Sequence, residues 1–324
     1  MEQIGKDIVQ AVQFLKEDGL VAIPTETVYG LAANAFSATA VAKIFAAKNR
    51  PSFNPLITHT HDVEQVKQYV QYMPEAALQL ASAFWPGPLT LLLPKKDIIP
   101  DIVTAGSELV AVRIPKHPLT LELLQQLDFP LAAPSANPFG YISPTKAAHV
   151  EEQLGERIDY ILDGGECKVG IESTIVGFEG DRVIVNRLGG ASLEAIEELV
   201  GKERVSVHAK VEENMNPKAP GMLKSHYAPG KKVLIGNISD LLNHYNKEEI
   251  AIITLKDYYP QISNDRQVAL SVSGDLNEAA QRLFSALREL DKLPVKFILA
   301  ELMPEYGLGK AINDRLMRAA ADKE

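Results

Sequence analysis

The sequence has little cysteine, no long apolar run and no excess of positive charge, and each shortage excludes a class of protein. The single cysteine, Cys167, cannot form an internal disulfide and supplies too few thiolates for a zinc site. No apolar run approaches the roughly 20 residues that a membrane-spanning helix needs. The first residues, Met1 to Asp7, lack the basic and apolar regions of a signal peptide. We therefore expect a cytoplasmic protein that makes no contact with a membrane.

The charge balance and the motif content narrow the range of functions further. The chain has 33 Lys and Arg against 42 Asp and Glu, a net charge of −9, which opposes broad non-specific binding of nucleic acid. A local basic cleft in such a protein suits a small anion such as ATP better than a long duplex. The sequence contains no HExxH, no CxxC, no complete P-loop and no Ser-His-Asp order. Its seven histidines show no metal-ligand spacing.

The length and the order of the predicted elements indicate two α/β domains. With 324 residues the chain can form two domains of ordinary size. We expect residues 1–200 to form an open twisted mixed sheet with helices. Residues 231–324 alternate short strands and helices, which predicts a smaller, doubly wound α/β domain with a parallel sheet. Asn and Pro residues break any periodicity in the connection 201–230, and such a long connection is usually disordered or functional.

Local signals place several elements within the first domain. Apolar residues at helical spacing predict a helix over 4–18, and Ser37 predicts the N-cap of a second helix that stops near Asn49. Ser143 before Pro144 fits the start of another helix. Two further elements are predicted: a helix after Ser192, and a hairpin formed by Ile171–Val176 and Arg182–Arg187.

Three basic residues stand out from this background. Lys48 and Arg50 lie one residue apart just past a helix, so they can face one polyanion together. Alternatively, they are cations favoured by the C-terminal dipole of that helix. Arg113 lies in an otherwise apolar strand, and a buried guanidinium must be paired or bound to an anion. An internal carboxylate and a ligand carboxylate both satisfy this requirement.

The remaining candidates are polar residues at the ends of apolar strands. In open α/β sheets, ligands bind beyond the carboxyl ends of the strands. Each candidate also has a local alternative, such as a threonine that bonds nearby backbone or a histidine with a structural role. The residues alone therefore predict an anion site with hydroxyl donors, and the candidates are Thr27, Asn54, His59, Ser135, Asn137, Ser143, Ser173 and Arg187.

Several motifs resemble the YrdC-like family in content and in order. They are Pro24–Leu31, Lys48-x-Arg50-Pro51, Asn54-Pro55-Leu56, Phe84–Thr90, Arg113-x-Pro115 and Ser135-Ala136-Asn137. The segment with Pro220-Gly221-Met222 and His226–Pro229, together with the second domain, is similar to the long form of this family. The resemblance implies an adenylyl transfer: L-threonine, bicarbonate or CO2, and ATP give threonylcarbamoyl-AMP and pyrophosphate. The product serves threonylcarbamoyladenosine formation next to the anticodon of certain tRNAs.

The same resemblance implies roles for individual residues. The residues that hold L-threonine would be Thr27, His59, Arg113, Ser173 and the backbone near Ala133. ATP, with Mg²⁺, would be held by Lys48, Arg50, Asn54, Ser135, Asn137, Ser143, Arg187, His226 and Tyr227, and no protein side chain is expected to ligate a metal. The linker 201–230 would close over the site. Lys48 and Arg50 would be the catalytic residues, because they can neutralise charge as pyrophosphate leaves.

The resemblance also implies partners and leaves two rival functions. The partners are the substrates, a contact with tRNA or double-stranded RNA, and downstream threonylcarbamoyl-transfer proteins. One rival is an RNA-binding protein that uses the same basic cleft, which the acidic charge and the lack of an aromatic stacking run oppose. The other is carbamoyl transfer from carbamoyl phosphate, which the absence of zinc-finger and acylphosphatase regions opposes.

Overall fold

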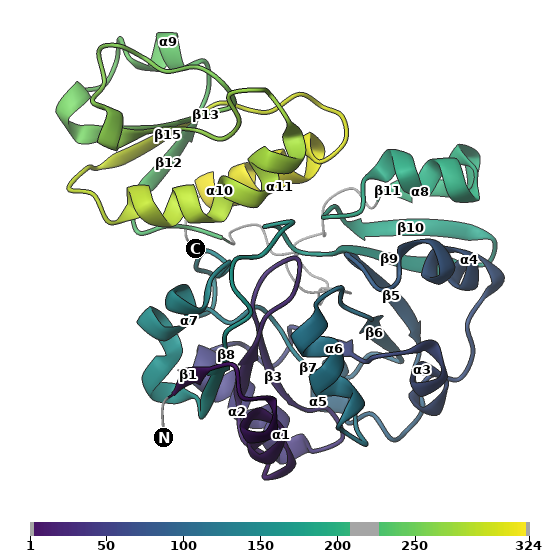
Figure 1. The fold of residues 1–324 in the computed structure, drawn as a ribbon. Helices are drawn as coiled ribbons and strands as arrows, with labels where there is room; N and C mark the ends of the chain where they lie inside the picture. Colours follow the sequence, from purple (N-terminus) through teal and green to yellow (C-terminus); the bar gives the residue numbers. More distant parts are fainter. Residues whose placement is uncertain (1–2, 208–226, 322–324) are drawn as a thin grey trace. The chain divides into compact units, whose positions relative to one another are not determined.

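The computed structural model describes residues 3–207 and 227–321 and divides the chain into two compact units (Figure 1). The first unit comprises Met1–Phe139, Pro144–Lys168 and Glu172–Leu223. The second comprises Gly140–Ser143, Val169–Ile171 and Lys224–Glu324. Short segments from the first 200 residues therefore belong to the second unit, which the sequence does not predict. Among the described residues, no helix has the length and apolar character that crossing a membrane requires.

The first unit is built on a mixed sheet, as predicted. Among the described residues it has eleven strands in the order β1-β8-β2-β3-β7-β4-β6-β5-β9-β10-β11. The strands are β1 (Ile4–Gly5), β2 (Val21–Ile23), β3 (Gly30–Asn34), β4 (Ile57–His59), β5 (Leu89–Pro94), β6 (Leu109–Arg113), β7 (Leu131–Ala132), β8 (Tyr160–Leu162), β9 (Thr174–Glu179), β10 (Arg182–Arg187) and β11 (Val205–Val207). The predicted hairpin is confirmed, since β9 and β10 pair antiparallel.

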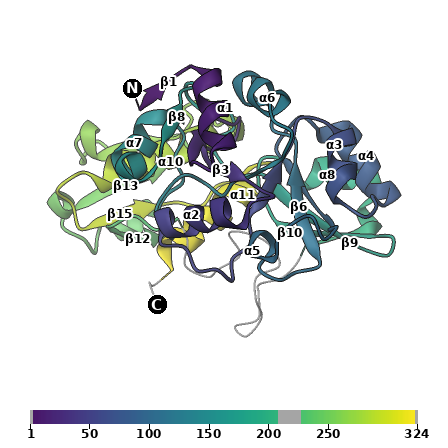
Figure 2. The same ribbon diagram turned by 90° about the horizontal axis from the view of Figure 1, so that it is seen from below.

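Helices surround this sheet, and their ends follow the capping signals. They are α1 (Ile8–Lys16), α2 (Ala38–Lys48), α3 (Val63–Tyr69), α4 (Glu75–Phe84), α5 (Asp101–Thr104), α6 (Pro118–Gln125), α7 (Ala147–Leu154) and α8 (Leu193–Val200). The predicted caps Ser37 and Ser192 accept hydrogen bonds from Ala40 N and Ala195 N. In Figures 1 and 2, α3, α4 and α8 are grouped near β9 and β10, at one end of the sheet.

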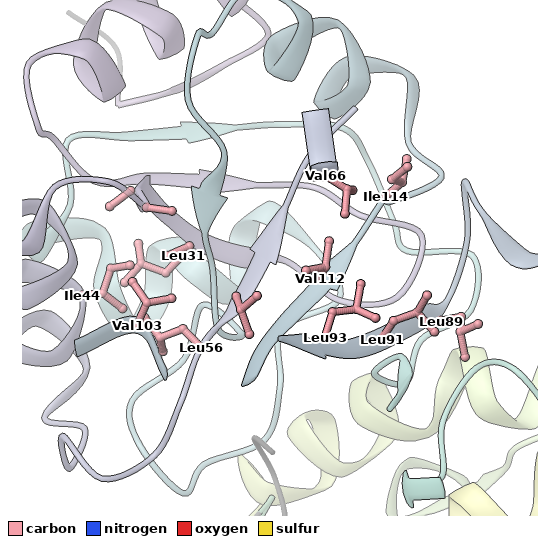
Figure 3. Packing of buried hydrophobic residues seen from close by; sticks show 14 of the residues in the cluster. Leu31, Ile44, Leu56, Val66, Leu89, Leu91, Leu93, Val103, Val112 and Ile114 are labelled. Carbon is pink, nitrogen blue, oxygen red and sulfur yellow. The ribbon is translucent and has the colours of Figure 1, made fainter. Parts of the chain in front are cut away.

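Apolar side chains alternate between the two faces of the sheet, so helices can pack on both. Leu31 of β3 joins a large core that includes Ile44 of α2 and Val112 of β6 (Figure 3). The neighbouring Ala32 belongs to a separate core with Leu15 of α1 and residues of α6. This period of two is the geometry of a strand that is covered on both sides. The loops at the strand ends are thereby held on a rigid support.

Three predictions in the first unit are corrected. Ile4–Gly5 is a strand paired with β8, and Asp7 caps α1, so the predicted helix over 4–18 begins too early. No helix begins at Ser143, because α7 starts at Ala147. The connection after Val200 is not devoid of regular structure, because β11 pairs in parallel with β10. The two missed strands are short and lie at the edges of the sheet, where one partner strand defines them.

The second unit contains a four-stranded parallel sheet with helices on both faces, which confirms the predicted doubly wound domain. Among the described residues the strand order is β12-β15-β13-β14. Figure 1 shows α9 on one side of this sheet and α10 and α11 on the other. The elements are β12 (Lys232–Ile235), α9 (Ile238–Leu241), β13 (Ile250–Thr254), β14 (Gln267–Ala269), α10 (Leu276–Asp291), β15 (Phe297–Ala300) and α11 (Gly309–Ala320).

Helix α10 also holds the two short segments that join this unit from earlier in the sequence. Arg288 donates hydrogen bonds to the carbonyl groups of Ile142 and Ser143, and the guanidinium lies 5.1 Å from the ring centre of Tyr141. The Tyr141 hydroxyl donates to Asp291 at 2.6 Å. Gly170 lies so close to the helix backbone that an added Cβ would be 2.3 Å from the Cα of Gln281. Both segments are therefore fixed by specific contacts with α10.

Candidate active site

Arg113 lies at the centre of a buried polar cluster in the first unit. It ends β6 and pairs in parallel register with His59 at the end of β4. The residue is only 3% exposed. Its Nε donates to the Gly87 carbonyl at 3.2 Å, and its Nη1 donates to Thr27 Oγ1 at 2.9 Å. Its Nη2 lies 2.7 Å from Oε1 of Glu26, so the guanidinium has an internal counter-ion.

The contact between Arg113 and Glu26 satisfies their charges but not their hydrogen-bonding capacity. Although Nη2 and Oε1 are close, neither atom has a hydrogen-bond partner within the described residues. The other oxygen of Glu26, Oε2, accepts a hydrogen bond from Lys116 N at 3.0 Å. A buried polar atom without a partner costs about 1–3 kcal/mol, and more when it is charged. The internal ion pair therefore coexists with a donor that a ligand carboxylate can use.

The strand directions correct the expectation that all residues of the site follow the carboxyl ends of strands at one edge of the sheet. Thr27 follows β2, and β2 runs opposite to β6 across the antiparallel pairs β2–β3, β3–β7 and β7–β4. Arg113 nevertheless reaches Thr27. In a mixed sheet with strands as short as three residues, a long side chain can join loops from both ends of the sheet. The site is therefore defined by these side chains rather than by a single sheet edge.

His59 is a neutral member of the same cluster. It is buried, and its Nδ1 lies 3.1 Å from the carbonyl oxygen of Ile57. Burial, followed by the positive charge of Arg113, lowers the pKa of His59 to about 3. The neighbouring Thr58 does not belong to this cluster, because successive side chains of a strand point to opposite faces and Thr58 pairs with Val112. The cluster thus offers an imidazole and hydroxyl groups without adding positive charge.

The pKa of His59 predicts a pH dependence of stability. The folded-state pKa of His59 lies below the ordinary value near 6.5, so between about pH 6.5 and 3 the unfolded chain binds a proton on this histidine that the folded chain does not. The free energy of unfolding therefore decreases as the pH is lowered through this range. At pH 4.5 the loss from His59 is about 2–3 kcal/mol relative to pH 7. Denaturant unfolding of the wild type and of His59→Gln at both pH values should show a smaller loss in the variant. Equal losses would contradict the assignment.

Lys48 and Arg50 form a second cluster with the loop that contains Ser135 and Asn137. Lys48 is the last residue of α2, is 1% exposed, and donates from Nζ to the carbonyl groups of Ser135 and Asn137. Asn49 ends the helix in the left-handed conformation. Lys48 is therefore not a surface cation that only complements the helix dipole. Burial, and then the charge of Arg50, lower the pKa of Lys48 well below its ordinary value, so a nearby polyanion would favour the charged ammonium.

Arg50 holds the loop that carries Asn54. Its Nε donates to the Asn54 carbonyl at 3.2 Å, and its Nη2 donates to the Pro55 carbonyl at 2.9 Å. The Asn54 side chain is completely buried, yet its amide oxygen and nitrogen have no hydrogen-bond partner within the described residues. Buried amides are normally paired. The Asn54 side chain is therefore suited to a ligand that both donates and accepts.

Backbone contacts connect the two clusters. Gly30 forms a bridge with Ser135, and Ala136 N donates to the Tyr29 carbonyl at 2.8 Å. Ala133 N donates to the Ile57 carbonyl at 2.8 Å. The loop that follows Ala133 therefore contacts Lys48 on one side and the Thr27–Gly30 segment on the other. The predicted residues of the first unit accordingly belong to one connected network.

Arg187 contacts Ser173, and the backbone next to Ser173 connects this pair to the network, since Thr174 N donates to the Pro88 carbonyl at 2.9 Å beside Gly87. Arg187 donates to the Ser173 carbonyl from Nε at 3.1 Å and from Nη2 at 2.8 Å, and Nη2 also donates to Ser173 Oγ at 3.2 Å. The hydroxyl groups of Ser173 and Thr90 lie 2.7 Å apart. Arg187 therefore fixes the position of Ser173. The family resemblance assigns Arg187 to ATP and Ser173 to L-threonine.

Gly189 packs directly against the backbone of Ser173, so we expect Gly189→Ala to displace that residue. An added Cβ would lie 2.3 Å from the Glu172 carbonyl oxygen and 2.4 Å from the Ser173 carbonyl carbon. The overpacking should cost about 1–3 kcal/mol of stability and weaken threonine binding. Denaturant unfolding and a threonine titration measure both effects. Gly155→Ala is the matched control, since its nearest neighbour would be 3.6 Å away. Unchanged threonine binding in Gly189→Ala would contradict the expectation.

Three predicted ATP-binding residues are not part of the first unit as described. Ser143 belongs to the second unit, where its carbonyl accepts from Arg288. The Tyr227 ring is buried in the second unit, 5.5 Å from Phe284 and 5.4 Å from the guanidinium of Arg315. His226 lies outside the described residues. Their contacts with ATP therefore stay predictions.

Sequence reasoning missed the role of Glu26. This residue lies within the quoted motif Pro24–Leu31, and the need of a buried arginine for a counter-ion was a usable signal. Many carboxylates could have met that need, so the sequence alone could not choose among them. Gly87 was missed for a similar reason, because its carbonyl rather than its side chain contacts Arg113.

The fold and this network define the class of protein. The chain belongs to the Sua5–YciO–YrdC family: the family model Sua5_yciO_yrdC, described as "Telomere recombination", matches residues 13–189. A second model, described as "Threonylcarbamoyl-AMP synthase, C-terminal domain", matches residues 191–321. The family predicted from the motifs is thereby confirmed, and so is the long form with a C-terminal domain.

Relatives of full length carry a more specific name. Threonylcarbamoyl-AMP synthase of Pyrococcus abyssi is 40% identical over 321 residues, covering 96% of this chain and 93% of the relative. Threonylcarbamoyl-AMP synthase of Bacillus subtilis is 42% identical over 324 residues, covering 98% and 93%. The crystal structure of P. abyssi Sua5 complexed with L-threonine matches with a TM-score of 0.89 at 40% identity, covering 97% of this chain and 94% of that one. E. coli YciO, at 21% identity and a TM-score of 0.51, shares the fold over 56% of this chain and 88% of its own.

Proposed function

We propose that this chain is an adenylyl-transferring enzyme that makes threonylcarbamoyl-AMP from L-threonine, bicarbonate or CO2, and ATP, and releases pyrophosphate. The observation that carries the proposal is the buried guanidinium of Arg113, whose Nη2 is paired with Glu26 Oε1 at 2.7 Å but makes no well-directed hydrogen bond within the described residues. A ligand carboxylate supplies that acceptor and can bind a guanidinium in bidentate fashion. The names of the full-length relatives and the L-threonine complex of P. abyssi Sua5 support this reading.

The threonine side of the site would use the Arg113 cluster. Arg113 binds the carboxylate, while Thr27, His59 and Ser173 recognise the hydroxyl group and the backbone near Ala133 completes the pocket. A site that hydrogen-bonds a substrate hydroxyl rejects analogues that lack it far better than an apolar pocket does. Neutral His59 can serve as such a partner because it stays unprotonated at physiological pH.

The ATP side would use the Lys48 cluster. Lys48 and Arg50 would neutralise charge on the phosphates as pyrophosphate leaves. Asn54, Ser135, Asn137 and Arg187 would complete the contacts, and the family resemblance also assigns Ser143, His226 and Tyr227 to ATP. Among the described residues, no group of three or more His, Cys, Asp or Glu could hold a metal ion. Mg²⁺ would arrive on the triphosphate, since it is commonly held by phosphates and water with few protein ligands.

The reaction requires no protein nucleophile. The amine of threonine forms a carbamate, with loss of a proton when it combines with CO2 and with loss of water when it combines with bicarbonate. A carbamate oxygen then attacks the α-phosphorus of ATP as pyrophosphate departs. Placing the two substrates in line can supply about 7–11 kcal/mol of the barrier reduction. The product would serve threonylcarbamoyladenosine formation in tRNA, through downstream transfer proteins and with contact to RNA, in the cytoplasm.

The proposal is tested by measuring pyrophosphate release from ATP. We expect release to require threonine and bicarbonate together, and to stop when either one is omitted. Carbamoyl phosphate supplied in place of bicarbonate should not support the reaction, which separates this activity from carbamoyl transfer. Release that is independent of threonine would overturn the proposal.

A further inference from the structure

The buried pair of Glu26 and Arg113 matches the two charged groups of an amino acid. We propose that Glu26 binds the α-ammonium group of the substrate whose carboxylate Arg113 binds, so that the pocket selects a zwitterion over a plain carboxylic acid. This inference rests on the proposed function. It adds to that function the residue that determines specificity for an amino acid.

The first observation is an ion pair whose two contacting atoms form no well-directed hydrogen bond with each other. Arg113 Nη2 and Glu26 Oε1 lie 2.7 Å apart, both are buried, and neither has a hydrogen-bond partner within the described residues. The ammonium and carboxylate groups of an α-amino acid are attached to the same carbon, so they also lie side by side. A zwitterion can therefore donate to Oε1 and accept from Nη2 at the same time.

The second observation is the charge of the Arg113–Glu26 pair and its neighbours. The positive guanidinium and the negative carboxylate cancel, and two titratable neighbours of the pair, His59 and Cys167, are uncharged at neutral pH because burial lowers the pKa of the first and raises that of the second. A plain carboxylate would leave one uncompensated negative charge in a buried site, which is costly. A zwitterion adds no net charge, so Glu26 penalises the first ligand and not the second.

The third observation is that Glu26 is held in place without using Oε1. Lys116 N donates to Oε2 at 3.0 Å, which fixes the carboxylate. The adjoining loop is also fixed, since Thr25 Oγ1 accepts from the amides of Thr27 and Val28 at 3.1 Å each. Preorganised groups lose little entropy when a ligand binds. Oε1, which has its ion-pair contact with Arg113 but no hydrogen bond within the described residues, can therefore accept from a ligand ammonium group.

The experiment compares two ligands that differ only in the amine. L-Threonine and (R)-3-hydroxybutanoate share the carboxylate and the hydroxyl, and calorimetric titration of the full chain gives a dissociation constant for each. We expect the wild type to prefer threonine by about 30-fold or more, and Glu26→Gln to reduce that preference to about threefold or less. The reduction should arise from weaker threonine binding together with unchanged or tighter binding of 3-hydroxybutanoate. If Glu26→Gln changes both affinities by the same factor, Glu26 only orients Arg113 and the proposal is wrong.

A second variant protects the test against a folding defect. Glu26→Asp keeps the charge but withdraws the carboxylate by one methylene, so we expect it to weaken threonine binding while keeping part of the preference. Thermal unfolding of each variant shows whether the chain is folded at the titration temperature. Should Glu26→Gln not fold, a Glu26→Asp variant with the full wild-type preference would overturn the proposal.

The failure of this inference differs from the failure of the proposed function. If the wild type releases pyrophosphate only with threonine but Glu26→Gln keeps the full preference for threonine over 3-hydroxybutanoate, the proposed function is supported and the proposed role of Glu26 is wrong. If the wild type neither binds threonine nor releases pyrophosphate in its presence, the proposed function itself is refuted.

Discussion

Replacing Arg113 with alanine is expected to weaken the affinity for threonine strongly while leaving the affinity for ATP nearly unchanged. The variant loses the guanidinium that we propose for the substrate carboxylate and leaves Glu26 buried without its counter-ion. Truncating one member of a buried charge pair costs about 2–5 kcal/mol of binding, which corresponds to a loss of threonine affinity of about 30-fold or more. Titrations with threonine and with a non-hydrolysable ATP analogue separate the two effects.

Folding must be controlled in this experiment, because an unpaired buried charge destabilises a protein by about 3–5 kcal/mol. The double variant Arg113→Met with Glu26→Gln removes both charges and should recover most of that stability. It should still fail to bind threonine, since the charged partner of the substrate carboxylate is gone. A loss of ATP affinity as large as the loss of threonine affinity would refute the assignment of Arg113 to the carboxylate.

Replacing Lys48 with methionine is expected to have the largest effect on the ATP side. Methionine keeps much of the apolar stem but removes the charge and the hydrogen bonds to the carbonyl groups of Ser135 and Asn137. Loss of one preorganised donor at a developing charge typically lowers turnover by about 100-fold to 1,000-fold. Steady-state pyrophosphate release should therefore fall by at least about 100-fold, with threonine binding within about threefold of the wild type.

The same helix offers a matched control. Lys43 lies in α2 as well, and its exposed ammonium donates to the Asp18 carbonyl at 2.7 Å. Lys43→Met removes one positive charge from the same element and should leave turnover within about twofold, because exposed contacts contribute little. If both variants lose activity equally, the effect belongs to the helix rather than to Lys48.

The sequence predicts those parts of the fold that local chemistry decides. Ser37 and Ser192 cap helices because a hydroxyl before an amphipathic segment satisfies free backbone amides without help from distant residues. The β9–β10 hairpin follows from two apolar runs separated by a short turn. In contrast, β1 and β11 exist only through their partners β8 and β10, so a two- or three-residue segment carries too weak a signal.

The candidate site shows the same division. Lys48, Arg50 and Arg113 could be selected from the sequence, because cations near a helix end or inside an apolar strand need a partner. Their actual partners could not be selected, because Glu26, Gly87 and the carbonyl groups that Lys48 contacts lie far away in the sequence. Ser143 illustrates a local signal that failed: a serine before a proline suggested a helix start, but the structure uses its carbonyl as the acceptor for Arg288.

The contacts of α10 with Gly140–Ser143 and Val169–Ile171 limit where this chain can be truncated or joined to part of another protein. Ending the chain at Val200 would remove Arg288 and Asp291, and would leave Tyr141 and the neighbouring carbonyl groups without the contacts described above. The C-terminal half therefore cannot be exchanged freely for that of a relative. To keep these contacts, the replacement needs an arginine and an acidic residue at the positions of Arg288 and Asp291. A chain that dispenses with that half must stabilise the same two loops by other means.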